Sequence, residues 1–181
     1  MGRRDVVQAL TAGALAILLL TPAAASAQDV TEPALKAAYI YNFAKFTEWP
    51  ADAIAPGAPF VFCVVGDAAI GEALVRTVKG LTLANHNIIV SYHPPDARPP
   101  EGCHIAYVSG TTSTQTAKVL AGLRDTPVLT ISDLAGFTQM GGIAKFFFEH
   151  GRLRFDIQLA AAKRVRLNIS SKLLTLARTT K

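Results

Sequence analysis

Four short apolar runs, with helical segments between them, constrain the fold of this chain more than any other feature. The runs cover residues 60–65, 87–92, 104–108 and 127–131, and helices are expected at 68–78 and 115–123. Strands that are apolar on both faces must be covered on both faces, which is typical of parallel sheets between layers of helices. The sequence therefore predicts an α/β fold with a central, mostly parallel sheet and helices on both faces.

The C-terminal part changes pattern and predicts an antiparallel hairpin. Residues 142–148 and 152–157 flank His150-Gly151, which suits a two-residue turn. The resulting register places Glu149 opposite Arg152, Phe148 opposite Leu153, Phe146 opposite Phe155, Lys145 opposite Asp156 and Ala144 opposite Ile157. Apolar pairs then share one face and opposite charges the other. A slip by one residue would destroy both sets, so the register is strongly specified.

Two further helices are expected, one at each end of the domain. Residues 31–46 repeat apolar side chains at three- and four-residue spacing, with Thr31 as the N-cap. A last helix is expected over 170–178, capped by Ser170. The first helix and the residues just after it carry Tyr39, Tyr41, Phe43, Phe46 and Trp49. One interpretation of these aromatic residues is core packing, and the other is a surface for a partner or a second copy of the chain.

The first 27 residues have the layout of a secretory signal peptide. Arg3 and Arg4 form the positive start, residues 9–20 are apolar, and Ala25-Ser26-Ala27 fits a cleavage site of the A-x-A type. The apolar run is shorter than the roughly 20 residues that a membrane-spanning helix needs. We therefore expect cleavage after Ala27, an exported protein that is not inserted in the membrane, and one domain over residues 28–181.

The two cysteines and the basic residues point to a disulfide and to a charged surface. In an exported chain, the pair Cys63 and Cys103 predicts a bridge, because a zinc site would need two further ligands at close spacing and neither cysteine has them. The net charge is +5, but the basic residues do not form a stripe with interleaved aromatic residues. We therefore expect neither a metal nor a nucleic-acid partner.

Motifs for catalysis or cofactor binding are missing from the sequence. Residues 66–71 begin and end with glycine but lack the Lys-Ser/Thr of a phosphate-binding loop, so a tight turn with Asp67 as N-cap is the better interpretation. The chain contains no Gly-x-Ser-x-Gly elbow, and its histidines lack metal-binding spacing. We expect a protein that is not an enzyme and holds no cofactor.

A series of motifs along the chain resembles the YfiR-like family of bacterial periplasmic proteins. The segments that carry the resemblance are 35–50 (LKAAYIYNFAKFTEWP), 62–67 (FCVVGD), 102–105 (GCHI), 127–132 (PVLTIS), 141–143 (GGI), 154–157 (RFDI) and 169–177 (ISSKLLTLA). Their order along the chain makes the resemblance specific, although no single motif is decisive.

The resemblance implies a compact α/β domain, often dimeric, with a regulatory and non-catalytic role. The best-understood member of the family represses an inner-membrane diguanylate cyclase by binding its periplasmic sensor segment, which lowers cyclic di-GMP. Cys63 and Cys103 match the bridging pair of the family, whereas the second pair of some members has no counterpart here. Two alternatives from other classes are a small-ligand-binding protein that serves a receptor or sensor kinase, and a hydrolase without a familiar motif.

Overall fold

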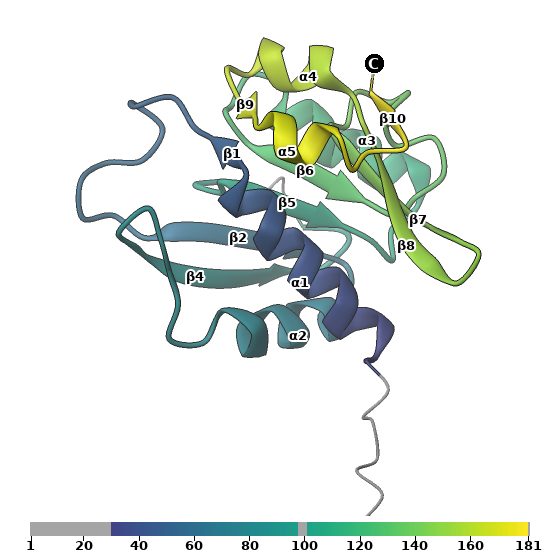
Figure 1. Ribbon diagram of the computed structural model, residues 1–181, viewed down its shortest axis with the longest axis horizontal. Helices are drawn as coiled ribbons and strands as arrows, with labels where there is room; N and C mark the ends of the chain where they lie inside the picture. Colours follow the sequence, from purple (N-terminus) through teal and green to yellow (C-terminus); the bar gives the residue numbers. More distant parts are fainter. Residues whose placement is uncertain (1–29, 98–100, 181) are drawn as a thin grey trace, which may run out of the picture.

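A curled sheet of eight strands, in the order β10-β8-β7-β6-β5-β2-β4-β3, forms the centre of the molecule (Figure 1). The computed structural model describes residues 30–97 and 101–180, so the predicted signal peptide lies outside the described residues. The strands of this sheet are β2 (Phe60–Val65), β3 (Thr82–Leu83), β4 (His86–His93), β5 (Ile105–Val108), β6 (Leu129–Ser132), β7 (Ala144–Glu149), β8 (Arg152–Ile157) and β10 (Thr179–Thr180).

The described part of the chain also forms five helices and a small second sheet. The helices are α1 (Glu32–Lys45), α2 (Ala68–Val78), α3 (Ser113–Leu123), α4 (Leu159–Arg164) and α5 (Ser171–Leu174). β1 (Thr47–Glu48) and β9 (Asn168–Ile169) pair antiparallel to each other, apart from the main sheet. The helices formed by the described residues are all too short or too polar to span a bilayer.

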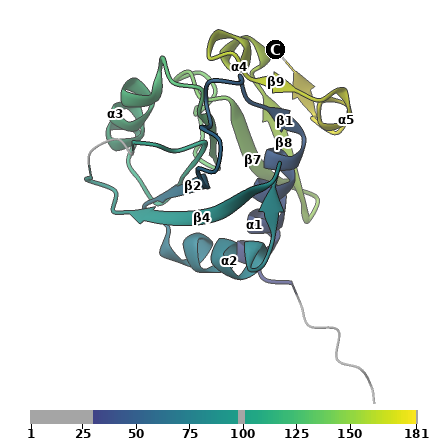
Figure 2. The same ribbon diagram turned by 90° about the vertical axis from the view of Figure 1, so that its left-hand side faces the viewer.

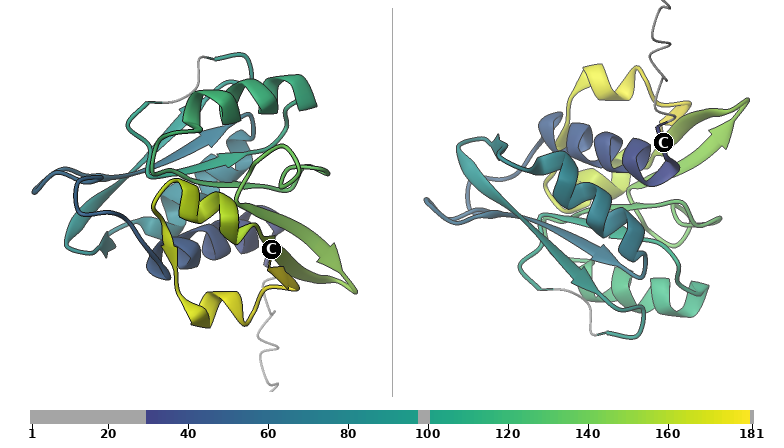
Figure 3. Two further views of the ribbon diagram at one scale, coloured as in Figure 1. Left: turned by 90° about the horizontal axis from the view of Figure 1, so that it is seen from above. Right: turned by 90° about the horizontal axis from the view of Figure 1, so that it is seen from below.

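The layered, mostly parallel arrangement predicted from the sequence is confirmed. β2 runs parallel to both β4 and β5, and β6 runs parallel to β5 and β7. Helices α1 and α2 pack together on one side of the sheet, and α3 lies on the other side (Figure 2 and Figure 3). The buried side chains follow this division: Ile40 and Leu74 belong to a large cluster, whereas Val119 and Leu123 of α3 belong to a smaller one.

Helices α1, α2 and α3 begin where local capping groups satisfy their first backbone N–H groups. The side chains of Thr31 and Asp67 accept hydrogen bonds from the backbone of Ala34 and Ile70, at the starts of α1 and α2. Thr112 and Gln115 form a capping box at the start of α3. These side-chain acceptors replace hydrogen bonds that the first turn of a helix cannot make internally. The predicted N-caps Thr31 and Asp67 are therefore confirmed.

The hairpin of β7 and β8 has the predicted register at all five predicted pairs. His150 and Gly151 both have positive φ angles, +49° and +72°, as a tight two-residue hairpin turn requires. The prediction that Lys145 pairs with Asp156 is only partly right, however. Lys145 lies opposite Asp156 in the ladder, but the carboxylate of Asp156 forms its ion pair with Arg178, at 3.0 Å.

Two predictions from the sequence were wrong: the length of the last helix and the burial of both faces of β4. The last helix ends at Leu174 instead of 178, because Arg178 donates a backbone hydrogen bond to Phe155 and the chain then pairs with β8 as β10. Strand β4 is not covered on both faces, since Ile89 and Tyr92 are exposed. Of the strands that the described residues form, only the two-residue β3 lies beyond β4, so β4 is close to an open edge of the sheet.

Candidate functional site

The disulfide predicted from the two cysteines is present and buried. Cys63 lies in β2 and Cys103 lies just before β5, with their Cα atoms 5.8 Å apart. This separation is within the range that a disulfide requires. Because β2 and β5 are neighbours at the centre of the sheet, the bridge joins two strands that also share a ladder of hydrogen bonds. Cys63 and Cys103 therefore form a covalent link inside the smaller core cluster.

One histidine lies beside this bridge without forming a metal site in the oxidised protein. The ligand atoms of Cys63, Cys103 and His93 all lie within 4.8 Å of one another. Both sulfurs are joined to each other, so neither is a thiolate that could bind a metal. The Nε2 atom of His93 lies 3.0 Å from the Ser91 hydroxyl oxygen, and partial burial lowers the pKa of His93. His93 is the one ligand that this group offers while the bridge is intact.

Phe43 belongs to the core, so its assignment to a candidate interaction surface needs correction. Its side chain is 1% exposed and meets the rings of Phe146 and Phe155 edge to face, with centroids 5.4 and 4.9 Å away. Aromatic rings in this arrangement add to the stability gained from burial. Phe43 therefore anchors α1 on the β7–β8 hairpin, as the core-packing interpretation predicted.

The other aromatic residues of this set are half-buried and divide between two hollows on either side of α1. Tyr39 and Phe46 line the first, a groove of about 380 Å³ that also contains Leu153, Leu173 and Leu176. We call this hollow the α1–α5 groove. Leu176 is 66% exposed, and Arg154 and Lys172 supply positive charge along the lining. The lining of the α1–α5 groove is therefore mostly apolar, and its charged residues are both basic.

Tyr41 and Trp49 line the second hollow, at the C-terminal end of α1. Its volume is about 590 Å³, and its wall includes β1 and the β3–β4 turn. Trp49 packs edge to face on Phe60, with the ring centroids 4.9 Å apart. The indole N–H of Trp49 and the hydroxyl of Thr47 are buried and make no hydrogen bond within the described residues. The five aromatic residues thus divide between two hollows, with Phe43 buried at the base of the α1–α5 groove, and do not form one continuous patch.

A buried polar cluster joins α1 to the carboxyl ends of β5 and β6. Lys36 is 5% exposed, and its ammonium group lies 2.6 Å from a carboxylate oxygen of both Asp133 and Glu32. Ser109 donates a hydrogen bond of 2.7 Å to the other oxygen of Asp133. The hydroxyl of Tyr107 is also buried and makes no hydrogen bond of standard geometry among the described residues. No sequence motif had indicated this cluster.

The cluster holds its charges in their ordinary ionised forms. Burial alone would raise the pKa of Asp133, but its hydrogen bonds with Lys36 and Ser109 outweigh burial and lower it. Burial alone would lower the pKa of Lys36, but its bonds with Asp133 and Glu32 raise it. Burial also raises the pKa of Tyr107. A nucleophilic amine or a strong general base is therefore not favoured here, because Lys36 remains protonated and Asp133 is a weak base.

The sheet also has a topological switch point, where α/β proteins commonly bind ligands, but the backbone fills it. Helix α2 follows β2 on one side of the sheet, and α3 follows β5 on the other, so the switch point lies between the ends of β2 and β5. Gly66 has a φ angle of +90°, and a Cβ atom there would overlap the carbonyl oxygen of Ser109. The two loops are thus in direct contact, which supports the interpretation of residues 66–71 as a tight turn.

The comparison with known families identifies a family whose profile covers most of the chain. The profile of the family described as YfiR/HmsC-like matches residues 33–178, which include every described helix and strand except Glu32, the first residue of α1, and the two residues of β10. A search of curated proteins found no match. The matched range contains both cysteines, the α1–α5 groove and the polar cluster apart from Glu32.

Proposed function

Because this chain belongs to the YfiR/HmsC-like family, we propose that it represses an inner-membrane diguanylate cyclase by binding the periplasmic segment of that enzyme. Membership of the family supports, in general terms, a regulator of diguanylate cyclase signalling that works in the periplasm and interacts with a membrane signalling protein. The observation that carries the proposal is the match over residues 33–178, which includes almost the whole described fold.

The proposed mechanism is stoichiometric binding without catalysis. The polar cluster around Asp133 supports this view, because its ion pairs favour a protonated Lys36 and an ionised Asp133. The loop contact between Gly66 and Ser109 supports it further, since it occupies the place where an α/β enzyme commonly binds its substrate. We expect no turnover of esters, phosphate esters or nucleotides by the exported protein.

The α1–α5 groove is the surface that we propose for the cyclase segment. Its lining combines the half-buried rings of Tyr39 and Phe46 with the exposed Leu176, so a partner can bury apolar area there. Arg154 and Lys172 complement an acidic partner, and such charges accelerate association and help to select the partner. We therefore propose an apolar segment with acidic flanking residues as the occupant.

The proposal is tested by measuring cyclic di-GMP in the native host. Deletion of the gene is expected to raise the cellular level, and expression of the full chain is expected to lower it again. The variant Leu176→Asp should fail to restore repression, because it places a carboxylate in the apolar groove. Val75→Asp is the matched control, since Val75 is 52% exposed on α2, outside the groove.

Two results would count against the proposal at different levels. An unchanged cyclic di-GMP level after deletion would refute regulation of a cyclase. Full repression by Leu176→Asp, with normal repression by Val75→Asp, would leave regulation intact and refute the groove as the binding surface. Crosslinking from position 176 to the periplasmic segment of a cyclase provides the direct measurement of contact.

A further inference from the structure

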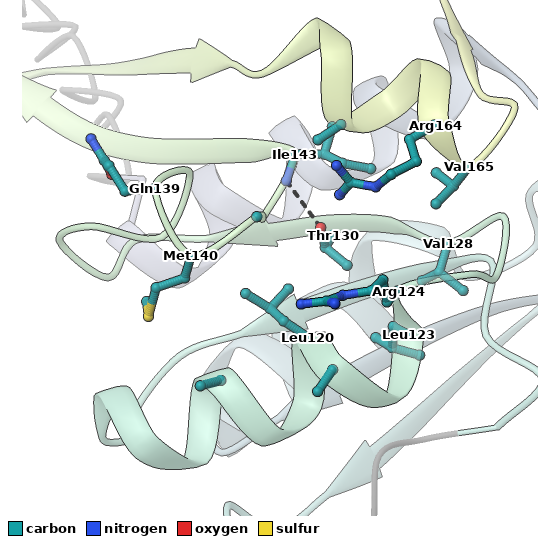
Figure 4. A pocket seen from close by; sticks show the side chains of 14 residues that line it. Leu120, Leu123, Arg124, Val128, Thr130, Gln139, Met140, Ile143, Arg164 and Val165 are labelled. Atoms are coloured by element: carbon teal, nitrogen blue, oxygen red, sulfur yellow. Dashed lines mark hydrogen bonds between the residues drawn. The ribbon is translucent and has the colours of Figure 1, made fainter.

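A third hollow of about 390 Å³ lies between α3 and α4, and none of its lining residues belongs to the α1–α5 groove. Its walls are the C-terminal half of α3, the start of β6, residues 139–141 and the C-terminal part of α4. We call it the α3–α4 pocket. A volume of this size is within the range of small-molecule sites in proteins. Figure 4 shows the pocket and the side chains that line it.

Two arginines reach into the α3–α4 pocket from different helices. Arg124 is the C-cap of α3, and Arg164 is the last residue of α4. Figure 4 shows both side chains extending into the same opening, Arg164 from the α4 side and Arg124 from the α3 side. Cations interact favourably with helix C-termini, which explains why each arginine is tolerated where it is. That effect does not explain why the two side chains converge on one hollow.

Among residues 30–97 and 101–180, no carboxylate pairs with either of these guanidinium groups. Within the described residues, the ion pairs of the protein involve Lys36, Arg76, Arg166 and Arg178, but neither Arg124 nor Arg164. The residues that line the pocket include no Asp and no Glu. Guanidinium groups bind carboxylate and phosphate groups through paired N–H donors. The charge of the pocket is therefore complementary to an anion.

The floor between the arginines is apolar, with one polar group. Leu120, Val128, Ile143 and Val165 line the pocket and are buried. Thr130 is 5% exposed, and its hydroxyl oxygen accepts a hydrogen bond of 3.0 Å from the backbone N–H of Ile143. Its own O–H donates to no acceptor among the hydrogen bonds of the described residues, so it can serve as a third donor to a ligand.

We propose that the α3–α4 pocket binds a small organic anion that has an apolar body. The acid group would lie between Arg124 and Arg164, and the apolar body would cover the aliphatic floor. A carboxylate and a phosphate share the recognition chemistry that the two guanidinium groups offer. This proposal does not rest on the proposed repression of a cyclase, because none of the residues involved lines the α1–α5 groove.

The test is calorimetric titration of the exported protein with octanoate, octyl phosphate and 1-octanol. The two anions are expected to bind, and the alcohol of the same chain length is expected to bind at least about tenfold more weakly, because it offers no charge to the arginines. The ratio of the two anion affinities distinguishes a carboxylate head group from a phosphate head group.

Three variants and one control locate the site. Arg124→Gln and Arg164→Gln should each weaken anion binding by roughly tenfold or more. Ala121→Phe should block binding with both arginines intact, since Ala121 is exposed and lines the pocket. Lys118→Gln is the matched control: it removes a cation from α3 but lies outside the lining. Thermal melting of each variant verifies that it is folded.

Equal affinity for octanoate and 1-octanol would overturn the proposal, as would failure of both anions to bind. Binding that is unchanged in folded Arg124→Gln, Arg164→Gln and Ala121→Phe would also overturn it, because the site would then lie elsewhere. Equal weakening by Lys118→Gln and Arg124→Gln would show a diffuse charge effect and would count against a defined pocket. Each of these results leaves the measurement of cyclic di-GMP unaffected.

Discussion

The bridge between Cys63 and Cys103 joins residues 40 positions apart in the sequence. In the chain-entropy model, closing a loop of this length stabilises a folded protein by about 4 kcal/mol. We expect Cys63→Ser to lower the free energy of unfolding by about this amount, measured by urea denaturation without reductant. Less folded protein should then be present in the native host, and cellular cyclic di-GMP should rise.

Cys103→Ser provides the control for that prediction. Either substitution breaks the same bond, so the double variant should lose no more stability than the larger of the two single losses. Losses that add in the double variant would mean that the two cysteines stabilise the protein independently. The bridge would then not account for the effect.

Asp133 is expected to make the protein sensitive to acid. Its pKa in the folded state lies below the usual value of 3.8, so its contribution to stability is present above that value. The contribution is lost as the pH falls from about 3.8 through the lower folded pKa. Asp133→Asn should lower the free energy of unfolding by about 2–3 kcal/mol at neutral pH. This loss is smaller than that expected when a fully buried ion pair is broken, because Lys36 still pairs with Glu32.

The matched control for this prediction is Glu32→Gln, which removes the exposed partner of the same lysine. Glu32 has a side chain that is 55% exposed, so its loss should cost under about 1 kcal/mol. Urea midpoints measured between neutral pH and pH 3 follow both effects. Equal losses in the two variants, or an unchanged acid sensitivity in Asp133→Asn, would contradict the role assigned to the buried pair.

At the level of elements, Arg178 ties the C-terminal segment to the β7–β8 hairpin. Its guanidinium group lies 3.0 Å from Asp156, 3.6 Å from Glu149 and 4.1 Å from the centre of the Phe147 ring. We expect Arg178→Ala to cost about 1–2 kcal/mol, because partly exposed ion pairs and cation–π contacts each contribute up to about 1 kcal/mol. Hydrogen exchange of the Arg178 amide, which bonds to Phe155, should accelerate in this variant.

Lys145→Ala is the natural comparison for Arg178→Ala. Lys145 lies opposite Asp156 in the ladder but forms no ion pair with it, so its removal should cost less than the removal of Arg178. A larger loss of stability for Lys145→Ala than for Arg178→Ala would contradict this expectation and favour the Lys145–Asp156 pair that the sequence pattern predicted. The comparison thus decides which cation stabilises the hairpin in solution.

At the level of the whole molecule, the precursor is expected to be processed on export. Intact mass or N-terminal sequencing of the exported protein should show Gln28 as the first residue, because Ala25 and Ala27 provide the small side chains that cleavage requires. Ala27→Leu should slow cleavage and leave the longer chain in the membrane fraction. A mature protein that begins elsewhere, or unchanged processing of Ala27→Leu, would contradict this prediction.

The family match, the disulfide and the layered fold could all be predicted from the sequence, because each depends on local patterns or on the identity of a few residues. Apolar runs of strand length predict a parallel sheet, and an alternating pattern about a turn specifies the hairpin register. Capping residues such as Thr31 and Asp67 indicate helix starts, since their side chains bond to backbone groups only three residues away. Such contacts join residues that are close in the sequence, so a short stretch of sequence is enough to predict them.

Only the tertiary structure could decide which side chains meet across the fold. Lys36 and Asp133 are 97 positions apart, and their contact depends on where α1 crosses the sheet and on the order of its strands. The same holds for Arg124 and Arg164, which converge because α3 and α4 flank one hollow. It also holds for Phe43, which shares a helical repeat with Tyr39 and Phe46 but is the one of the three that the fold buries almost completely. Periodicity assigns a residue to a face of its element, whereas burial and pairing are set by what the rest of the chain places against that face.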